Sequence, residues 1–165
     1  MKRQNERIRS MAQSAMIAAL YVALTFAANL AGLASGAVQL RLSEALTVLP
    51  VFTPAAVPGL FLGCALANLL TGSALWDVVA GSLATLLGAL GTYWLRKYKF
   101  LCLLPPIAAN TLVIPFVLAW VYGAEGTIPF FMLTVGVGEL LSCGLLGWLL
   151  RAALEKYGKG IRWAK

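Results

Sequence analysis

Apolar residues fill most of this chain in long runs, and short polar or basic stretches separate the runs. A helix that spans a bilayer needs about 20 predominantly apolar residues. The runs predict helices over these approximate ranges: 11–33, 43–53, 54–72, 76–97, 101–122 and 129–156. The second run is too short for a full crossing. We therefore expect an all-α integral membrane protein of six transmembrane helices, the second one short, in a single membrane domain over 1–165.

Prolines leave one alternative open in the second and third runs. Pro50, Pro54 and Pro58 punctuate this region, and proline interrupts the hydrogen bonding of a helix interior. A short helix followed by a full one is our preferred division. The alternative is one long kinked helix across 43–72, which leaves five spans.

Basic residues favour six spans. Every Lys and Arg except Arg41 lies in one of three clusters: Lys2, Arg3, Arg7 and Arg9; Arg96, Lys97 and Lys99; Arg151, Lys156, Lys159, Arg162 and Lys165. Cytoplasmic loops of membrane proteins are rich in Lys and Arg. Six spans place all three clusters on one side, whereas five would separate the two basic ends. We therefore expect both termini in the cytoplasm and the loops 34–42, 72–75 and 123–128 outside.

Composition agrees with a membrane protein and excludes several functions. Charged residues make up 12% of the chain, whereas soluble proteins have roughly 25%. The net charge of +7 does not indicate nucleic acid as a partner, because the basic residues flank apolar spans. No phosphate-binding Gly-rich loop is present, so the chain does not hydrolyse ATP. With no histidine and with Cys64, Cys102 and Cys143 isolated in apolar helices, we expect no metal and no cofactor.

Alanine recurs every four residues along the first predicted helix, at Ala15, Ala19, Ala23, Ala27 and Ala31. Helices in lipid associate by close packing, and a stripe of small residues lets another backbone approach. Two interpretations stay open: packing against the other helices of this chain, or docking of a separate membrane subunit.

Polar residues inside apolar segments are candidate functional residues, because placing them in a bilayer is expensive. The five are Glu44, Asn68, Asp77, Asn110 and Glu139. Under the six-helix topology all lie in the outer half of the membrane or near its middle, which predicts a pocket that opens outward. Glu44 and Asp77 have an alternative role at helix starts, where Ser43 favours capping and a carboxylate suits the helix dipole.

The chemistry of this set favours a flat, nitrogen-rich ligand. Carboxylates accept hydrogen bonds from paired N–H groups or from an ammonium, and amides serve ring carbonyls and nitrogens. Trp76 or Phe130 can stack on a flat ring. The set is suited to a neutral or cationic solute rather than an anion.

Six helices in this length, the alanine stripe, basic ends and no ATPase motif resemble the substrate-binding S components of energy-coupling factor (ECF) transporters. Within that group, "RLSEALTVLPVF" (41–52) resembles the signature of the queuosine-precursor transporter family. The resemblance implies an S-component-like bundle in the bacterial plasma membrane, without enzymatic activity. It also implies that a transmembrane coupling protein and two cytosolic ATPase subunits drive uptake by toppling the S component in the membrane.

The same resemblance implies a substrate and a docking surface. The substrate is a 7-deazaguanine, with 7-aminomethyl-7-deazaguanine preferred, and Ala15, Ala19 and Ala23 take the position of the coupling-protein contact. One carboxylate of Glu44, Asp77 or Glu139 then meets the guanine edge and another the ammonium. Arg41 either pairs with Glu44 or Asp77 or contacts the ligand. The alternatives are an S component for a different vitamin, an intramembrane enzyme and a stand-alone transporter.

Overall fold

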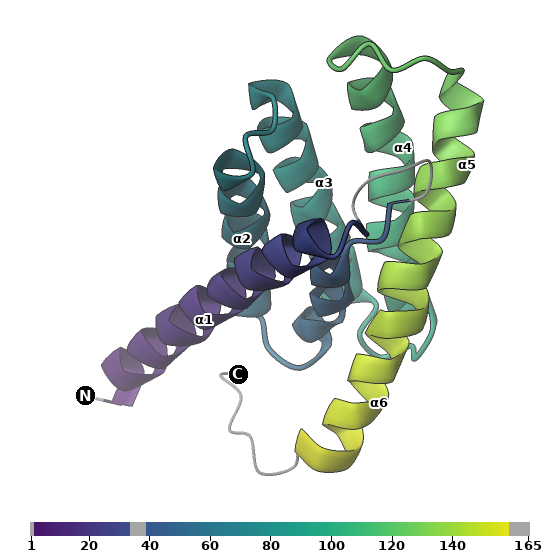
Figure 1. The fold of residues 1–165 in the computed structure, drawn as a ribbon. Helices are drawn as coiled ribbons and strands as arrows, with labels where there is room; N and C mark the ends of the chain where they lie inside the picture. Colours follow the sequence, from purple (N-terminus) through teal and green to yellow (C-terminus); the bar gives the residue numbers. More distant parts are fainter. Residues whose placement is uncertain (1, 34–38, 159–165) are drawn as a thin grey trace.

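The computed structural model describes residues 2–33 and 39–158, and all regular elements in these ranges are helices (Figure 1). In chain order they are α1 Lys2–Leu30, η1 Leu42–Val51, α2 Ala56–Leu70, α3 Leu75–Trp94, η2 Leu101–Leu103, α4 Leu104–Trp120, α5 Ile128–Glu139, η3 Leu140–Leu146 and α6 Gly147–Tyr157. The last three follow one another without a break, and η3 is a π-helical segment within this long helix.

Four helices of the described residues are long and apolar enough to cross a membrane: Arg3–Leu30, Leu75–Trp94, Leu101–Trp120 and Ile128–Tyr157. Two shorter apolar helices, η1 and α2, complete the set. The expected all-helical membrane fold is therefore confirmed, and the chain has the character of a multi-pass membrane protein. Six crossings and cytoplasmic termini stay predictions.

Several helix boundaries differ from the expected ones. α1 begins at Lys2 rather than near residue 11, because Lys, Arg, Gln and Glu are good helix formers and continue the helix beyond its apolar part. The second helix is a 3₁₀ helix with Pro50 inside it. It is separate from α2, as in our preferred division, but α2 has 15 residues and is itself one of the shorter apolar helices. α3 ends at Trp94 rather than near residue 97.

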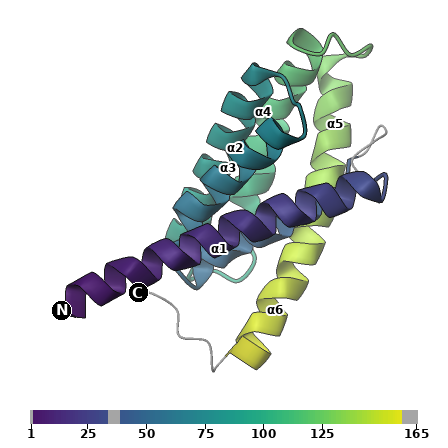
Figure 2. The same ribbon diagram turned by 60° about the vertical axis from the view of Figure 1, so that its left-hand side comes forward.

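The helices form a bundle that α1 crosses obliquely (Figures 1 and 2). α2, α3, α4 and α5 pack in sequence, each against the next. The short helix η1 contacts α1, α3, η3 and α6 and so occupies the middle of the molecule. Its Val48 side chain is fully buried, and Leu46 and Leu49 join Ile17 and Leu60 in the main apolar core.

One face of α1 packs closely on α2. A Cβ atom added at Gly63 would lie 2.8 Å from the Tyr21 Cβ and 3.0 Å from the Ala18 Cα. One turn earlier, the Ser14 hydroxyl donates a hydrogen bond of 2.7 Å to the Ala55 carbonyl oxygen. Gly63 therefore brings the two backbones into contact, as small residues do between membrane helices.

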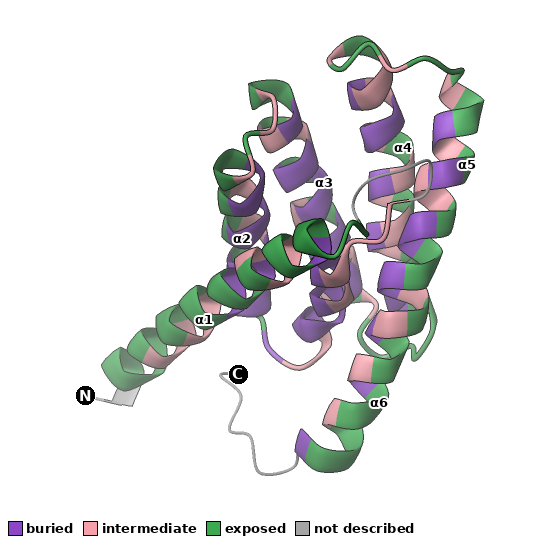
Figure 3. Cartoon of the chain, viewed as in Figure 1, coloured by how far each residue is buried: buried purple, intermediate pink, exposed green. Residues whose placement is uncertain are grey.

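The alanine stripe lies on the other side of α1. Ala15, Ala19, Ala23 and Ala27 are all exposed, and exposed positions follow α1 along its length (Figure 3). Within this chain the stripe is therefore not the surface that α1 uses to pack.

Replacing Gly63 with alanine is expected to lower the stability of the fold by about 1–3 kcal/mol, because overpacking a tight contact forces backbone shifts. Thermal unfolding in detergent measures the effect. Gly144→Ala is the matched control, since the nearest atom to its added Cβ is the Ile107 Cδ1 at 3.9 Å. Equal unfolding temperatures for the two variants would show that the α1–α2 contact is looser than described.

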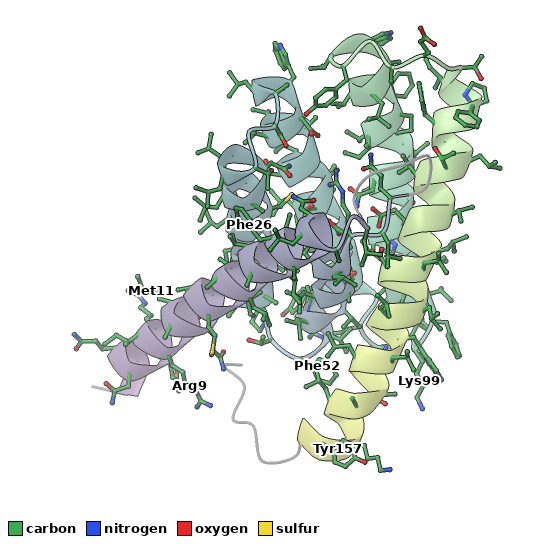
Figure 4. All side chains as sticks on the ribbon, viewed as in Figure 1. Arg9, Met11, Phe26, Phe52, Lys99 and Tyr157 are labelled. Carbon is green, nitrogen blue, oxygen red and sulfur yellow. The ribbon has the colours of Figure 1, made fainter. Side chains whose placement is uncertain are left out.

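The basic ends of the helices gather at one end of the molecule. Arg9, Lys99 and Tyr157 lie toward the lower end in Figure 4, whereas the α2–α3 and α4–α5 connections lie at the upper end. This arrangement is consistent with one cytoplasmic side. Lys159, Arg162 and Lys165 of the third cluster, and positions 34–38 of the first predicted outer loop, lie outside the described residues.

Candidate binding site

A cavity of about 320 Å³ lies between α1, α2, α3, α4 and the segment before η1. Its polar lining consists of Tyr21, Thr25, Asn29, Gln39, Arg41, Ser43, Asn68, Thr71, Ser73, Asp77 and Tyr122. The size falls at the lower end of the range for small-molecule sites. The cavity lies near the helix ends that are predicted to face outside, away from the basic cluster at 96–99. Four of its lining residues lie at or near these ends: Asn29, Thr71, Ser73 and Tyr122.

Asp77 presents a carboxylate in the first turn of α3. The Tyr122 hydroxyl donates to the Asp77 Oδ2 at 2.9 Å and itself accepts from the Ala74 N–H at 3.1 Å. The Oδ1 has no hydrogen-bond partner among the described residues. The helix dipole stabilises the charged carboxylate here. The hydrogen bond to the Oδ2 therefore orients the Asp77 carboxylate, and the Oδ1 is available to a ligand.

Arg41 reaches the cavity because the segment before η1 lies directly on the long C-terminal helix. A Cβ atom at Gly138 would lie 2.3 Å from the Gln39 carbonyl oxygen, so only glycine permits this approach. The Arg41 N–H then donates to the Ser142 hydroxyl at 3.1 Å. In the described part of the chain no carboxylate lies within 4.0 Å of the Arg41 guanidinium. Its charge interacts at longer range with Glu44 and Asp77, and we expect its N–H donors to meet acceptors on a ligand.

Gly138→Ala is expected to weaken ligand binding about tenfold. The added Cβ displaces the backbone around Gln39, which moves Arg41 and costs roughly one charged hydrogen bond. Gly136→Ala, two residues away, adds a Cβ whose nearest neighbour is the Thr111 Cγ2 at 3.5 Å and serves as the control. Ligand titration of both purified variants measures the difference. Unchanged affinity in Gly138→Ala would remove this segment from the site.

A second polar layer is buried behind the cavity wall. The Tyr21 hydroxyl donates to the Glu44 Oε1, the Asn110 Nδ2 donates to the Glu139 Oε1 at 2.9 Å, and the Cys143 thiol donates to the Glu139 Oε2 at 3.1 Å. Glu44 is fully buried and Glu139 is 6% exposed. The Glu44 Oε2 is buried without any hydrogen-bond partner.

Acidic and thiol groups meet in this layer in a way that sequence spacing did not predict. One ligand atom each from Glu44, Glu139 and Cys143 lies within 4.8 Å of the others. This set of atoms is able to hold a cation. Cys143 is buried as expected, but its thiol takes part in a polar network and does not act only as a small hydrophobe.

Six of the predicted site residues fall into two groups. Arg41, Asn68 and Asp77 line the cavity. Glu44, Asn110 and Glu139 form the buried layer behind it.

Trp76 lies apart from both groups. It is 70% exposed and borders a separate apolar groove between α3 and α4. Phe130 is 47% exposed and lines neither.

The capping alternative for Ser43 is wrong. η1 begins at Leu42 with Arg41 at the N-cap position and without a side-chain cap. The Ser43 hydroxyl instead accepts a hydrogen bond of 3.0 Å from Thr25 and borders the cavity.

The structure adds lining residues that the sequence did not single out, chiefly Tyr21, Thr25, Thr71, Ser73 and Tyr122. Hydroxyl residues are common in membrane helices, so they carry no signal of their own. The hydrogen bond from Tyr122 to Asp77 joins residues 45 positions apart, so no local sequence pattern contains it.

The fold and the site define a polytopic helical membrane protein with a small polar cavity at one end. Residues 11–156 match the family described as QueT transporter. The chain belongs to this family of transporters, which confirms the resemblance drawn from residues 41–52.

One curated relative is the "Queuosine precursor transporter QueT" of Lactococcus lactis subsp. cremoris (strain MG1363), to which the chain is 36% identical over 87 residues. The aligned region covers 52% of this chain and 50% of that protein, so it spans about half of the relative's length. No solved structure matches the chain.

Proposed function

We propose that this protein is the substrate-binding S component of an ECF-type importer and captures a queuosine precursor, a 7-deazaguanine, from outside a bacterial cell. The observation that carries the proposal is the cavity whose lining includes both Asp77 and Arg41. Membership of the QueT transporter family supports the substrate class, as does the name of the Lactococcus lactis relative.

The two charged groups are complementary to a guanine-like edge. Such an edge carries two neighbouring N–H donors beside a carbonyl acceptor. A carboxylate accepts from paired N–H groups, and a guanidinium donates to a carbonyl. We assign Asp77 to the N–H donors and Arg41 to the carbonyl, with Asn68 and the surrounding hydroxyls completing the contacts.

The alanine stripe supplies the surface for the coupling protein. Ala15, Ala19 and Ala23 are exposed, while the opposite face of α1 packs on Gly59 and Gly63 of α2. A flat strip of small side chains lets a helix of a second protein approach closely. Two cytosolic ATPase subunits bound to that coupling protein would supply the energy for toppling, with both termini of this chain in the cytoplasm.

The molecule that co-purifies with the protein tests the substrate class. The chain is purified in mild detergent, denatured, and the released small molecules are identified by mass spectrometry. We expect a 7-deazaguanine at close to one molecule per chain. Stoichiometric release of an unrelated vitamin would overturn the substrate and favour the alternative, an S component for that vitamin.

A further inference from the structure

We propose that the turn between α3 and η2, residues 95–100, binds the headgroup of an anionic phospholipid, and that Arg96, Lys97 and Lys99 contact its phosphate. The turn lies at the basic end of the molecule, where Lys99 sits beside the C-terminal helix (Figure 4). None of its residues lines the ligand cavity. The site is therefore separate from the proposed function and independent of the solute that the cavity binds.

The turn presents three exposed cations without an acidic partner. Arg96, Lys97 and Lys99 are all exposed, and residues 95–100 contain no Asp or Glu. Over 2–33 and 39–158, the one ion pair joins the Arg151 Nε to the Glu155 Oε1 at 2.8 Å. The described part of the chain therefore leaves the charge of the turn unneutralised. An anion is the complementary ligand for such a surface.

A buried arginine fixes the turn on the C-terminal helix. Arg151 of α6 is 7% exposed, and its Nη1 donates to the Lys99 carbonyl oxygen at 3.0 Å and to the Tyr98 carbonyl oxygen at 3.4 Å. The Glu155 carboxylate accepts from the Nε of the same guanidinium. Hydrogen bonds from a charged donor are stronger than those between neutral groups. Arg151 therefore holds the backbone of the turn against α6, while the Lys99 side chain stays exposed.

Contacts between α3 and the start of α4 fix the base of the turn. A Cβ atom added at Gly91 would lie 2.4 Å from the Pro105 Cβ, and the Thr92 hydroxyl donates to the Cys102 carbonyl oxygen at 2.8 Å. The Arg96 guanidinium carbon lies 4.2 Å from the centre of the Tyr93 ring, which is a cation–π contact. Arg96 is thus oriented before a ligand arrives, and such preorganisation lowers the entropic cost of binding.

Exposed aromatic side chains flank the cations. Trp94, Tyr98 and Phe100 are all exposed, and aromatic residues favour the interface between water and lipid. A guanidinium matches the geometry of a phosphate, and the negative surface of the cytoplasmic leaflet attracts basic segments. Cations beside aromatic rings therefore suit a phosphate that is attached to apolar chains.

The lipid-facing surface of α3 leads directly to the turn. Leu83, Leu87 and Trp94 are exposed, and positions four and eleven residues apart lie on one face of a helix. An acyl chain along this face places its headgroup beside Arg96, Lys97 and Lys99. An acidic surface of a partner protein is the competing occupant. The continuous apolar face below the cations favours the lipid, and the protein is treated as an outcome of the test.

Native mass spectrometry of the detergent-purified full chain tests the site. The protein is titrated with phosphatidylglycerol and, separately, with the net-neutral phosphatidylethanolamine of the same acyl chains. We expect the first phosphatidylglycerol to bind at least about tenfold more tightly, since one Lys or Arg near an anionic surface is worth about fivefold. Combining Arg96→Gln, Lys97→Gln and Lys99→Gln should bring the two lipids within about threefold.

Two further variants show whether the shape of the turn matters. The first combines Arg3→Gln, Arg7→Gln and Arg9→Gln, which removes the same charge from α1 and should leave the preference unchanged. The second, Arg151→Gln, keeps the three exposed cations but removes the contact that holds the turn, and should lower the preference at least about threefold. Thermal unfolding identifies variants that are folded. The two triple variants decide the question if Arg151→Gln does not fold.

Four results would overturn the site. Equal affinity of the wild-type protein for both lipids is the first. An equal loss in the two triple variants would show that net charge alone attracts the lipid, and full preference in folded Arg151→Gln would show that the turn is not a preformed site. Displacement of phosphatidylglycerol by an equal concentration of glycerol phosphate would assign the turn to free phosphates.

The partner-protein alternative has its own signature. If the turn variant keeps its lipid preference but no longer co-purifies with the coupling protein, the turn is a protein interface and the lipid site is overturned. None of these measurements depends on the small molecule that co-purifies with the chain. A failure of the proposed substrate and a failure of the lipid site are therefore distinguishable.

Discussion

Asp77→Asn is expected to weaken binding of a 7-deazaguanine about 100-fold. The carboxylate accepts two N–H groups in the proposed complex, and hydrogen bonds to a charged group contribute about 1.5–3 kcal/mol each, with tenfold in affinity for every 1.4 kcal/mol. The amide keeps the size of the side chain but replaces one acceptor by a donor that opposes the ligand N–H. We therefore expect Asp77→Asn to lose more affinity than removal of the carboxylate alone would cause.

Calorimetric titration of the purified variant measures this loss. Glu125→Gln is the matched control, because it makes the same carboxylate-to-amide change at an exposed loop position. The thermal unfolding temperature of Asp77→Asn is recorded alongside, so that a folding defect is recognised. A variant that is folded and binds within about threefold of the wild-type protein would contradict the role of Asp77.

Ala19→Trp is expected to abolish transport while ligand binding by the isolated protein stays unchanged. A Trp in the middle of the stripe holds an approaching helix away, because association in lipid depends on close van der Waals contact between small residues. Ala19 is exposed, and the residues of α1 that contact the α2 glycines are Ser14, Ile17, Ala18 and Tyr21. The ligand cavity does not include it.

Co-purification with the coupling protein and uptake in proteoliposomes measure the effect. Leu87→Trp places the same side chain at an exposed position of α3, where Leu87 is 61% exposed, and should leave association and uptake intact. If Ala19→Trp still assembles and transports, the docking surface lies elsewhere. If both variants lose assembly equally, a large side chain at any exposed helix position has this effect, and the stripe has no special role.

The membrane fold could be predicted because its signal is local. Apolar runs of spanning length and prolines between them mark helices without any knowledge of packing. The exact ends could not be predicted in this way. α1 starts at Lys2, since helix formation continues in polar sequence, and the π-helical segment Leu140–Leu146 has no simple pattern in the sequence.

The candidate site was predictable only in part, for a physical reason. A charged or amide residue in an apolar run is conspicuous, and this principle identified Asp77 and Glu139. Whether such a residue lines a cavity depends on which side chain stands in front of it. Tyr21 covers Glu44, and the approach of Gln39 to Gly138 places Arg41. These contacts join segments far apart in the chain, so no local pattern contains them.

Titration of 7-aminomethyl-7-deazaguanine into the isolated, detergent-purified protein tests the central claim most directly. We predict binding of one molecule per chain with a Kd below about 1 µM, in the absence of any coupling protein or ATPase. No detectable heat and no ligand-induced rise in the unfolding temperature of a folded protein would contradict it.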